Sequence, residues 1–134
     1  GMAGLRLGYA AAHPAWIAEL EKVRPPYNIN ALTQAAVPLL LAERTLLDEQ
    51  ARAIRAERAR LTTALATIAG VVVYPSATNF VVVRVPDANA AFAALRTANI
   101  LVKNLHGWHP LLTNCLRITV GTPAENDALL KGLK

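Results

Sequence analysis

A change of sequence pattern at Gly70 constrains the fold more than any other feature of this chain. Over residues 43–68, apolar residues recur every seven positions, at Leu47, Ile54, Leu61 and Ile68. This spacing predicts one long helix with a single apolar stripe, and its alanine-rich flanks favour packing against a sheet over a coiled coil. Gly70 is the expected C-cap of this helix. After Gly70, the runs VVVYP and NFVVVRVP are rich in β-branched residues and predict strands.

The rest of the chain after Gly70 continues this mixed pattern. It predicts a helix over residues 88–98, strands at ILVKN and CLRITVG, and a final helix from Pro123. Asp87 and Thr122 stand at the N-cap positions of the two helices, and Glu125 completes a capping box with Thr122. The sequence therefore predicts an α+β fold, with a short sheet that has helices packed on one side.

The first 42 residues have a different organisation. They predict a short buried strand over residues 5–12, a helix over residues 14–23, a linker at RPPYNIN, and a helix from Ala31. Asn30 is expected to cap the last of these helices, and Pro38 is expected to kink or end it. We read residues 1–42 as a fragment of a second domain, and residues 43–134 as a linking helix followed by a small domain.

The charge of the chain raises the question of an acidic partner. Fourteen lysines and arginines against nine aspartates and glutamates give the 134 residues a net charge of +5. The densest basic run comprises Arg52, Arg55, Arg58 and Arg60. Glu49 and Glu57 interrupt it on a predicted helix, and the scattered aromatic residues offer no stacking platform. We therefore read the run as a solvated face and expect no nucleic-acid partner.

Hydrophobicity and cysteine content indicate the class of protein. Hydrophobic residues make up 54% of the chain, which indicates a folded protein. No stretch approaches the roughly 20 apolar residues that span a bilayer, so no membrane partner is expected. The single cysteine, Cys115, excludes an internal disulfide and is compatible with a reducing compartment. We expect a cytoplasmic protein.

Three cationic residues lie on predicted strands in apolar surroundings. In CLRITVG, period-two alternation sends Leu116 and Ile118 to one face and Arg117 to the other. The planar guanidinium of Arg117 suits bidentate binding of a carboxylate. Lys103 ends the ILVKN strand, and Arg6 is the only charge in GLRLGY. Each of the three is either an exposed surface cation or part of an anion-binding site, and the pattern alone leaves both possibilities open.

For the other reactive or aromatic residues we expect no functional role. His106 and His109 share the loop HGWHP but lack a neighbouring cysteine or carboxylate, so no metal site is expected. Cys115 has no adjacent base and is expected to be a small buried hydrophobic residue. Trp16 and Trp108 are expected to be packing residues.

Five segments in order resemble the C-terminal portion of histidinol-phosphate aminotransferases: GMAGLRLGYA, RPPYNINALTQAA, PSATNFVVVRV, ILVKNL and NCLRITVGTPAENDALL. The resemblance covers essentially the whole chain. It implies a fold-type I aminotransferase that depends on pyridoxal 5'-phosphate and forms a homodimer. Residues 1–42 would then be a remnant of the large cofactor-binding domain, and residues 43–134 the linking helix and small domain. The implied substrates are an amino acid and a phosphorylated imidazole compound of histidine biosynthesis.

The same resemblance assigns roles to the three cations. Arg6 matches the arginine that contacts the cofactor phosphate, and Arg117 matches the arginine that binds the substrate carboxylate. Lys103 stands where these enzymes commonly have an arginine for the substrate phosphate. A lysine keeps the charge but lacks the forked guanidinium that can form two parallel hydrogen bonds. The family's Schiff-base lysine matches no residue of this sequence. No catalytic residue is therefore expected here, and the 134 residues alone are expected to be inactive.

A second hypothesis is a non-catalytic module for dimerisation or interaction, derived from an aminotransferase small domain. Its basis is the predicted strand over residues 5–12. An apolar strand without a neighbouring strand favours edge-to-edge association or domain swapping.

Overall fold

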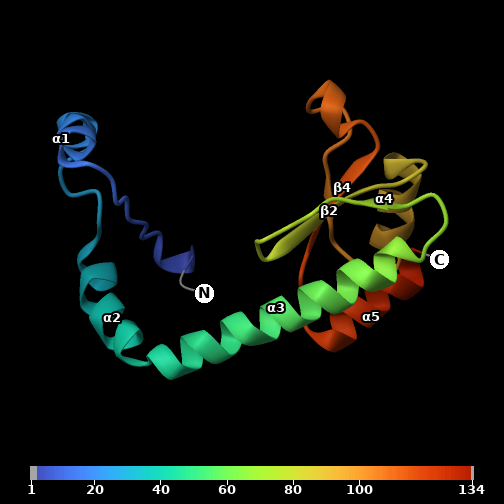
Figure 1. Cartoon of the computed structure of the whole chain (residues 1–134), viewed down its shortest axis with the longest axis horizontal. Helices are drawn as coiled ribbons and strands as arrows, with labels where there is room; N and C mark the ends of the chain where they lie inside the picture. Colours follow the sequence, from blue (N-terminus) through green and yellow to red (C-terminus); the bar gives the residue numbers. More distant parts are fainter. Residues whose placement is uncertain (1–2, 134) are drawn as a thin grey trace. The chain divides into compact units, whose positions relative to one another are not determined.

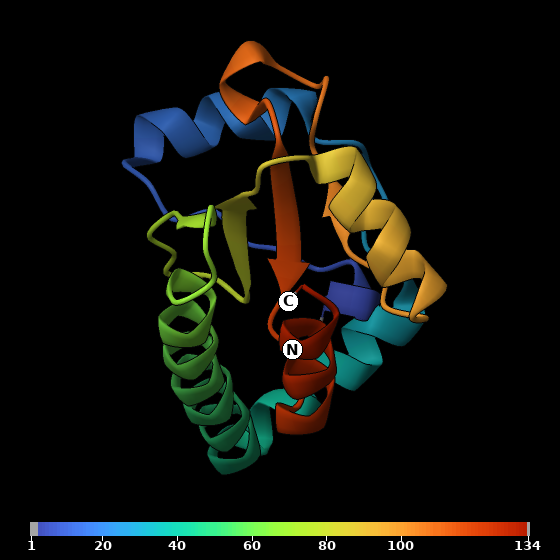
Figure 2. The same cartoon turned by 90° about the vertical axis from the view of Figure 1, so that its right-hand side faces the viewer.

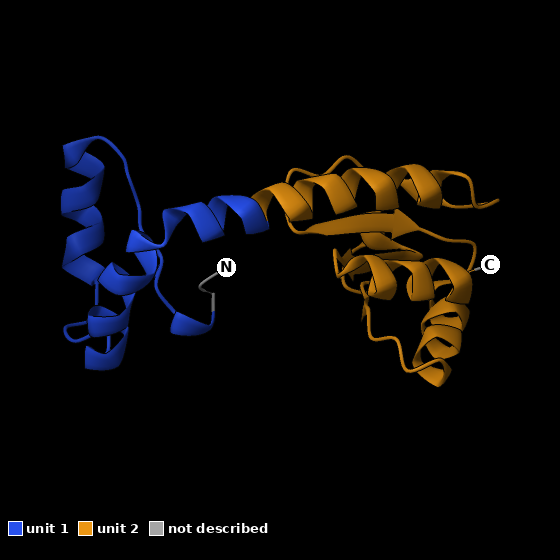
Figure 3. Ribbon diagram, turned by 90° about the horizontal axis from the view of Figure 1, so that it is seen from below, with its two compact units in different colours: residues 1–50 blue, residues 51–134 orange. Residues whose placement is uncertain are grey.

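A computed structural model describes residues 3–133 of the chain. The chain divides into two compact units, Gly1–Gln50 and Ala51–Lys134, which Figure 3 shows in blue and orange. The first unit contains a 3-10 helix, η1 (Ala3–Leu5), and the helices α1 (Pro14–Val23) and α2 (Ala31–Ala42). The boundary between the units falls inside helix α3 (Arg44–Ala66). Within residues 3–133, no helix has both the length and the apolar character needed to cross a bilayer.

The second unit is built on a four-stranded antiparallel sheet with the strand order β1-β2-β4-β3. Its elements after α3 are β1 (Val72–Val73), β2 (Phe80–Arg84), α4 (Ala88–Thr97), β3 (Lys103–Asn104), η2 (Pro110–Leu112), β4 (Cys115–Thr119) and α5 (Pro123–Gly132). Strands β2 and β3 both run antiparallel to β4, which lies between them, and α4 joins them. This arrangement is a split β-α-β unit. Figures 1 and 2 show the sheet with α4, α5 and the second half of α3.

The hydrophobic core lies between one face of this sheet and the three helices. The strand residues of this core are Val81, Val83, Leu116 and Ile118, all fully or almost fully buried. The helices contribute Leu61, Leu65, Ala88, Leu95 and Leu129. Each buried leucine or isoleucine stabilises the fold by about 1.5–3 kcal/mol. The predicted α+β fold, with a small sheet and an apolar stripe of the long helix packed on it, is confirmed.

A buried asparagine connects α5 to α3. Asn126 is 2% exposed, and its side-chain amide donates to Gly121 O at 3.0 Å and to Glu57 Oε2 at 2.9 Å. Its Oδ1 atom accepts from Gly121 N at 3.0 Å, so every polar atom of the amide is satisfied. Arg60 binds Glu57 at 2.9 Å and Asp127 at 2.6 Å. These polar contacts fix how the last helix lies along α3.

The N-caps that the sequence predicts are confirmed. Asn30 accepts from Thr33 N, and Asp87 accepts from the backbone N–H groups of the first turn of α4. Thr122 and Glu125 form the capping box of α5. The pKa of Glu125 is lowered, mainly because its carboxylate accepts the backbone N–H of Thr122. Each cap satisfies a backbone donor that the helix itself leaves free.

The strand predicted over residues 5–12 is wrong. Residues 3–5 form η1, Arg6 is a turn residue with φ 56°, and residues 7–13 have no regular structure. A strand needs a neighbour to take its backbone hydrogen bonds, and no described residue pairs with this segment. The unpaired strand that motivated the interaction-module hypothesis is therefore absent.

Three finer predictions are also corrected. Helix α3 ends at Ala66, so Gly70 is not its C-cap but a residue of the following turn, with φ 78°. Of the two effects predicted for Pro38, a kink or an end of the helix, the end is wrong, because α2 continues past Pro38 to Ala42. Strands β1 and β3 are edge strands and have only two residues each, so they are shorter than their β-branched runs suggested.

The basic run on α3 is solvated only in part. Arg52 and Arg55 are exposed, as expected. Arg58, in contrast, donates to Thr78 O at 2.6 Å, and Arg60 joins the polar contacts to α5. Half of this run therefore supports the packing of α3 within the second unit.

Replacing Asn126 by alanine should destabilise the second unit by about 2–3 kcal/mol, because the change leaves the N–H and C=O of Gly121 without their partner and removes one hydrogen bond to the Glu57 carboxylate. Urea unfolding measures this loss. The matched control is Asp127→Asn, which weakens only an exposed ion pair and should cost less than about 1 kcal/mol. A loss for Asn126→Ala no larger than that of the control would contradict the role of Asn126.

Acid should weaken the same contacts. Hydrogen bonds from Arg60, and then from Asn126, hold the pKa of Glu57 below its ordinary value. As the pH falls, the Glu57 carboxylate is therefore protonated first in the unfolded chain, at roughly pH 4.3. The stabilisation from its hydrogen bonds in the folded state is then lost as the pH falls through the lower pKa of that state. In urea unfolding, the stability difference between wild type and Glu57→Gln should be constant near neutral pH and shrink below about pH 4. A stability difference that stays constant in acid would argue against a lowered pKa of Glu57.

Candidate functional site

The pairing of β3 with β4 brings two of the predicted site residues together. Lys103 lies directly opposite Arg117 in the antiparallel register. Partners in such a pair point to the same face of a sheet, with Cβ atoms about 4.5–5.5 Å apart. Leu116 and Ile118 are buried in the core, so Arg117 and Lys103 project from the face opposite to it. We call this face the open face.

Cations and aromatic rings are paired on the open face. Alternation along β2 places Phe80, Val82 and Arg84 on the same face as Arg117. The guanidinium of Arg117 lies 5.3 Å from the centre of the Phe80 ring. In the same way, Arg84 lies 5.6 Å from the ring of Tyr74, and Lys103 Nζ lies 4.6 Å from the ring of Trp108. Ring faces attract cations without neutralising their charge, so the open face remains positive.

Arg84 differs from the other two cations because it has a structural role. Its Nε donates to Thr113 O at 3.2 Å, and its Nη2 donates to Leu111 O at 3.0 Å. These bonds tie the segment before β4 to β2. The guanidinium of Arg84 is therefore bound to backbone carbonyls, whereas no acceptor within residues 3–133 is hydrogen-bonded to the side chain of Lys103 or Arg117.

Lys103 and Arg117 also have no acidic partner among the described residues. Like charges directly opposite each other on a sheet are destabilising, by roughly 0.2–1 kcal/mol. A pair of neighbouring cations without a carboxylate is favourable when an anion binds between them, because each can then form a charge-assisted hydrogen bond. The arrangement is suited to a ligand with two negative charges.

Arg6 belongs to the first unit and is not part of this cross-strand pair. Its side chain is exposed. The turn that carries it is anchored to α2, because Thr33, which is buried, donates its hydroxyl to Leu5 O at 3.0 Å. Asn30 in turn donates to the Thr33 hydroxyl at 2.9 Å. An exposed guanidinium on an anchored turn can bind a phosphate group through two parallel hydrogen bonds.

The two histidines of the HGWHP loop serve local structure. His106 Nδ1 accepts from Asn114 N at 3.0 Å, and His109 Nδ1 accepts from Leu111 N at 3.2 Å. Cys115 is buried, as predicted. It lies on the face of β4 that carries Arg117 and does not belong to the core cluster, and its Sγ lies 3.6 Å from Thr113 O.

The predictions for the two tryptophans are wrong. Trp16 is 70% exposed and Trp108 is 66% exposed, so neither packs in the interior of its unit. The aromatic residues of the open face, Tyr74, Phe80 and Trp108, were all missed as neighbours of cations. Alternation along NFVVVRV could have placed Phe80 and Arg84 on one face. The Trp108 contact could not have been found in this way, because it depends on the path of a loop.

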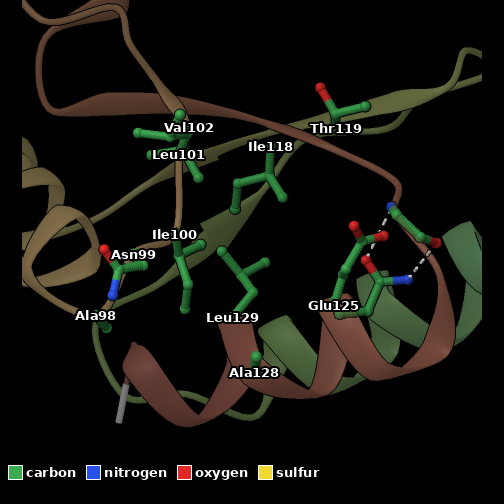
Figure 4. Close-up of a pocket in the computed structure, with 12 residues that line it drawn as sticks. Ala98, Asn99, Ile100, Leu101, Val102, Ile118, Thr119, Glu125, Ala128 and Leu129 are labelled. Carbon is green, nitrogen blue, oxygen red and sulfur yellow. Dashed lines mark hydrogen bonds between the residues drawn. The ribbon is translucent and has the colours of Figure 1, made fainter.

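A cavity of about 540 Å³ in the second unit lies away from the cation pair. Figure 4 shows it between the segment after α4, the end of β4 and helix α5. Its lining is mainly apolar and includes Ile100, Leu101, Ile118 and Leu129. None of the three predicted site residues lines it, so we do not assign the anion site to this cavity.

Comparisons with known proteins agree on one family. The family model described as aminotransferase class I and II matches residues 1–133. The histidinol-phosphate aminotransferase of Chromobacterium violaceum is 57% identical over 134 residues, and histidinol-phosphate aminotransferase 1 of Burkholderia lata is 56% identical over the same length. Each match covers all of this chain and 38% of the relative, so the chain spans less than half the length of these proteins. The resemblance predicted from the five segments is confirmed.

The comparison with solved structures finds similar folds over nearly the whole chain. A decarboxylase from Sulfurospirillum multivorans has a TM-score of 0.80 and 32% identity, over 99% of this chain and 39% of that protein. The histidinol-phosphate aminotransferase of Sinorhizobium meliloti, solved in complex with pyridoxal-5'-phosphate, has a TM-score of 0.79 and 31% identity, over 99% of this chain and 37% of its own.

Phosphate should stabilise the chain, because a ligand that binds only the folded state raises the free energy of unfolding, by about 0.4 kcal/mol when its concentration equals its Kd. Urea unfolding in phosphate and in chloride at equal ionic strength measures the gain. Arg117→Gln and Lys103→Gln should each reduce it, because each leaves only one of the two cations. Arg96→Gln, which removes an exposed arginine from the last turn of α4, should retain it. Equal gains in wild type and Arg117→Gln would refute the site.

Proposed function

This chain belongs to the class I and II aminotransferase family, and on that premise we propose that it is the C-terminal part of a pyridoxal-phosphate-dependent aminotransferase acting on histidinol phosphate. The observation that carries the proposal is the cross-strand pair of Lys103 and Arg117. Relatives at 52–57% identity carry the name histidinol-phosphate aminotransferase. The proposed reaction moves an amino group between an amino acid and a phosphorylated imidazole compound.

Arg117 is the proposed anchor for the substrate carboxylate. Its guanidinium can make two parallel hydrogen bonds to a carboxylate, which fix the orientation of that group as well as its position. The Phe80 ring lies 5.3 Å from the guanidinium and attracts it. Binding energy at this point holds the substrate in the orientation that the reaction needs.

Lys103 is the proposed partner of the substrate phosphate. A phosphate carries up to two negative charges near neutral pH, and Lys103 lies opposite Arg117 on the neighbouring strand, with no carboxylate among the described residues to neutralise it. The two cations thus match a substrate that has two anionic groups. A lysine supplies a point charge in place of a fork, so it demands less of the geometry of the phosphate than an arginine would.

Arg6 is the proposed contact of the cofactor phosphate. Its exposed guanidinium and the anchored turn fit this end of pyridoxal phosphate. When bound, the cofactor supplies an electron sink for transfer of the amino group. The lysine that binds the cofactor covalently in this family has no match in this sequence. We therefore expect the 134 residues alone to be inactive. We also propose that the whole enzyme is a homodimer and works in the cytoplasm, as the resemblance implies.

The experiment is carried out on the full-length protein that contains this segment. Arg117→Gln should lower kcat/KM for transamination of histidinol phosphate by about 100-fold or more, because charge-assisted hydrogen bonds contribute roughly 1.5–3 kcal/mol each. Arg117→Lys keeps the charge without the fork and should recover only part of this loss. The control Arg96→Gln should retain wild-type kcat/KM. Wild-type activity in Arg117→Gln would disprove the proposed role.

A further inference from the structure

The contact between Lys103 and Trp108 has no role in the proposed function. The ammonium lies 4.6 Å from the centre of the indole ring. Trp108 is 66% exposed, so its ring contributes little to the core of the unit. A large aromatic side chain that remains exposed above a cation of the candidate site calls for a reason other than packing.

The loop between β3 and β4 is built to hold the ring in place. Leu105 N donates to Cys115 O at 3.0 Å, which closes the base of the loop. Trp108 N donates to Leu105 O at 3.2 Å across a tight turn, and Gly107 has φ 86° in that turn. Such a φ value is readily adopted by glycine alone. His106 Nδ1 accepts the backbone N–H of Asn114, which ties the start of the loop to the residue just before β4.

A lysine at this position has two disadvantages as an anion ligand. Its side chain is flexible and loses rotamer entropy when it is fixed. Its ammonium is also repelled by the guanidinium of Arg117, its direct partner across the strands. Without another contact the ammonium of an exposed lysine is free to move in solvent. The indole face provides that contact, because a cation over a tryptophan ring is attracted by about 0.5–1 kcal/mol at an exposed site.

We infer that Trp108 is a positioning residue for phosphate binding, which restrains the ammonium of Lys103 on the open face, where its strand partner Arg117 also projects, so that an anionic group meets two neighbouring cations. The inference rests on the proposed function, which assigns Lys103 to the substrate phosphate. It adds a residue outside the strands to the determinants of phosphate affinity. Trp108 acts through Lys103 and makes no contact with the phosphate itself.

The test measures binding of inorganic phosphate to the 134-residue chain by NMR, from the shifts of the Lys103 ε-methylene and the Arg117 Nε–H. In wild type the ring should move the Lys103 ε-protons upfield, and Trp108→Ala should remove this displacement. Trp108→Ala should also raise the Kd for phosphate about two- to five-fold. Trp108→Phe keeps an aromatic face and should stay within about two-fold of wild type.

A second background separates positioning from a general effect on the loop. In Lys103→Met, Trp108→Ala should leave the Kd for phosphate unchanged, because the ring then has no cation to hold. The inference is overturned if Trp108→Ala binds phosphate as tightly as wild type, or if its effect persists in Lys103→Met. If phosphate shifts neither Lys103 nor Arg117 in wild type, the proposed site fails and the inference fails with it. Normal phosphate binding that is insensitive to Trp108 leaves the proposed function intact and refutes the inference alone.

Discussion

The register of β4 between β2 and β3 is the constraint on which the candidate site depends. Leu116 and Ile118 face the helices, and this fixes Arg117 on the opposite face. A shift by one residue would turn the whole strand over, bury the guanidinium and expose the two apolar residues. Core packing on one face thus specifies the chemistry of the other. The same register sets Lys103 opposite Arg117, although the two residues are 14 positions apart in the chain.

The polar contacts behind the sheet support this register from the side of the helices. Asn126 connects the turn after β4 to Glu57 of α3, so the C-terminal end of β4 is held where α5 begins. Arg84 holds the segment before β4 through two carbonyl groups. Both ends of the strand that carries Arg117 are therefore fixed by hydrogen bonds, so the backbone that presents the guanidinium is held in place.

The sequence predicts those parts of the fold whose causes are local. The caps at Asn30, Asp87 and Thr122 involve partners within three residues, and period-two alternation places Arg117 correctly. Predictions fail where the cause lies elsewhere in the chain. The apolar run over residues 5–12 has strand composition but no paired neighbour among the described residues, and the position of Trp108 depends on a turn and on cross-loop hydrogen bonds. The pairing of Lys103 with Arg117 also needed the strand order, which no local pattern contains.

The central claim is that the open face binds a ligand with two anionic groups through Lys103 and Arg117. The most direct measurement is a crystal structure of the full-length protein with O-phospho-L-serine, which carries a carboxylate and a phosphate. The account predicts the carboxylate on the guanidinium of Arg117 and the phosphate within hydrogen-bond distance of Lys103 Nζ. A ligand bound with both groups away from these two side chains would contradict it.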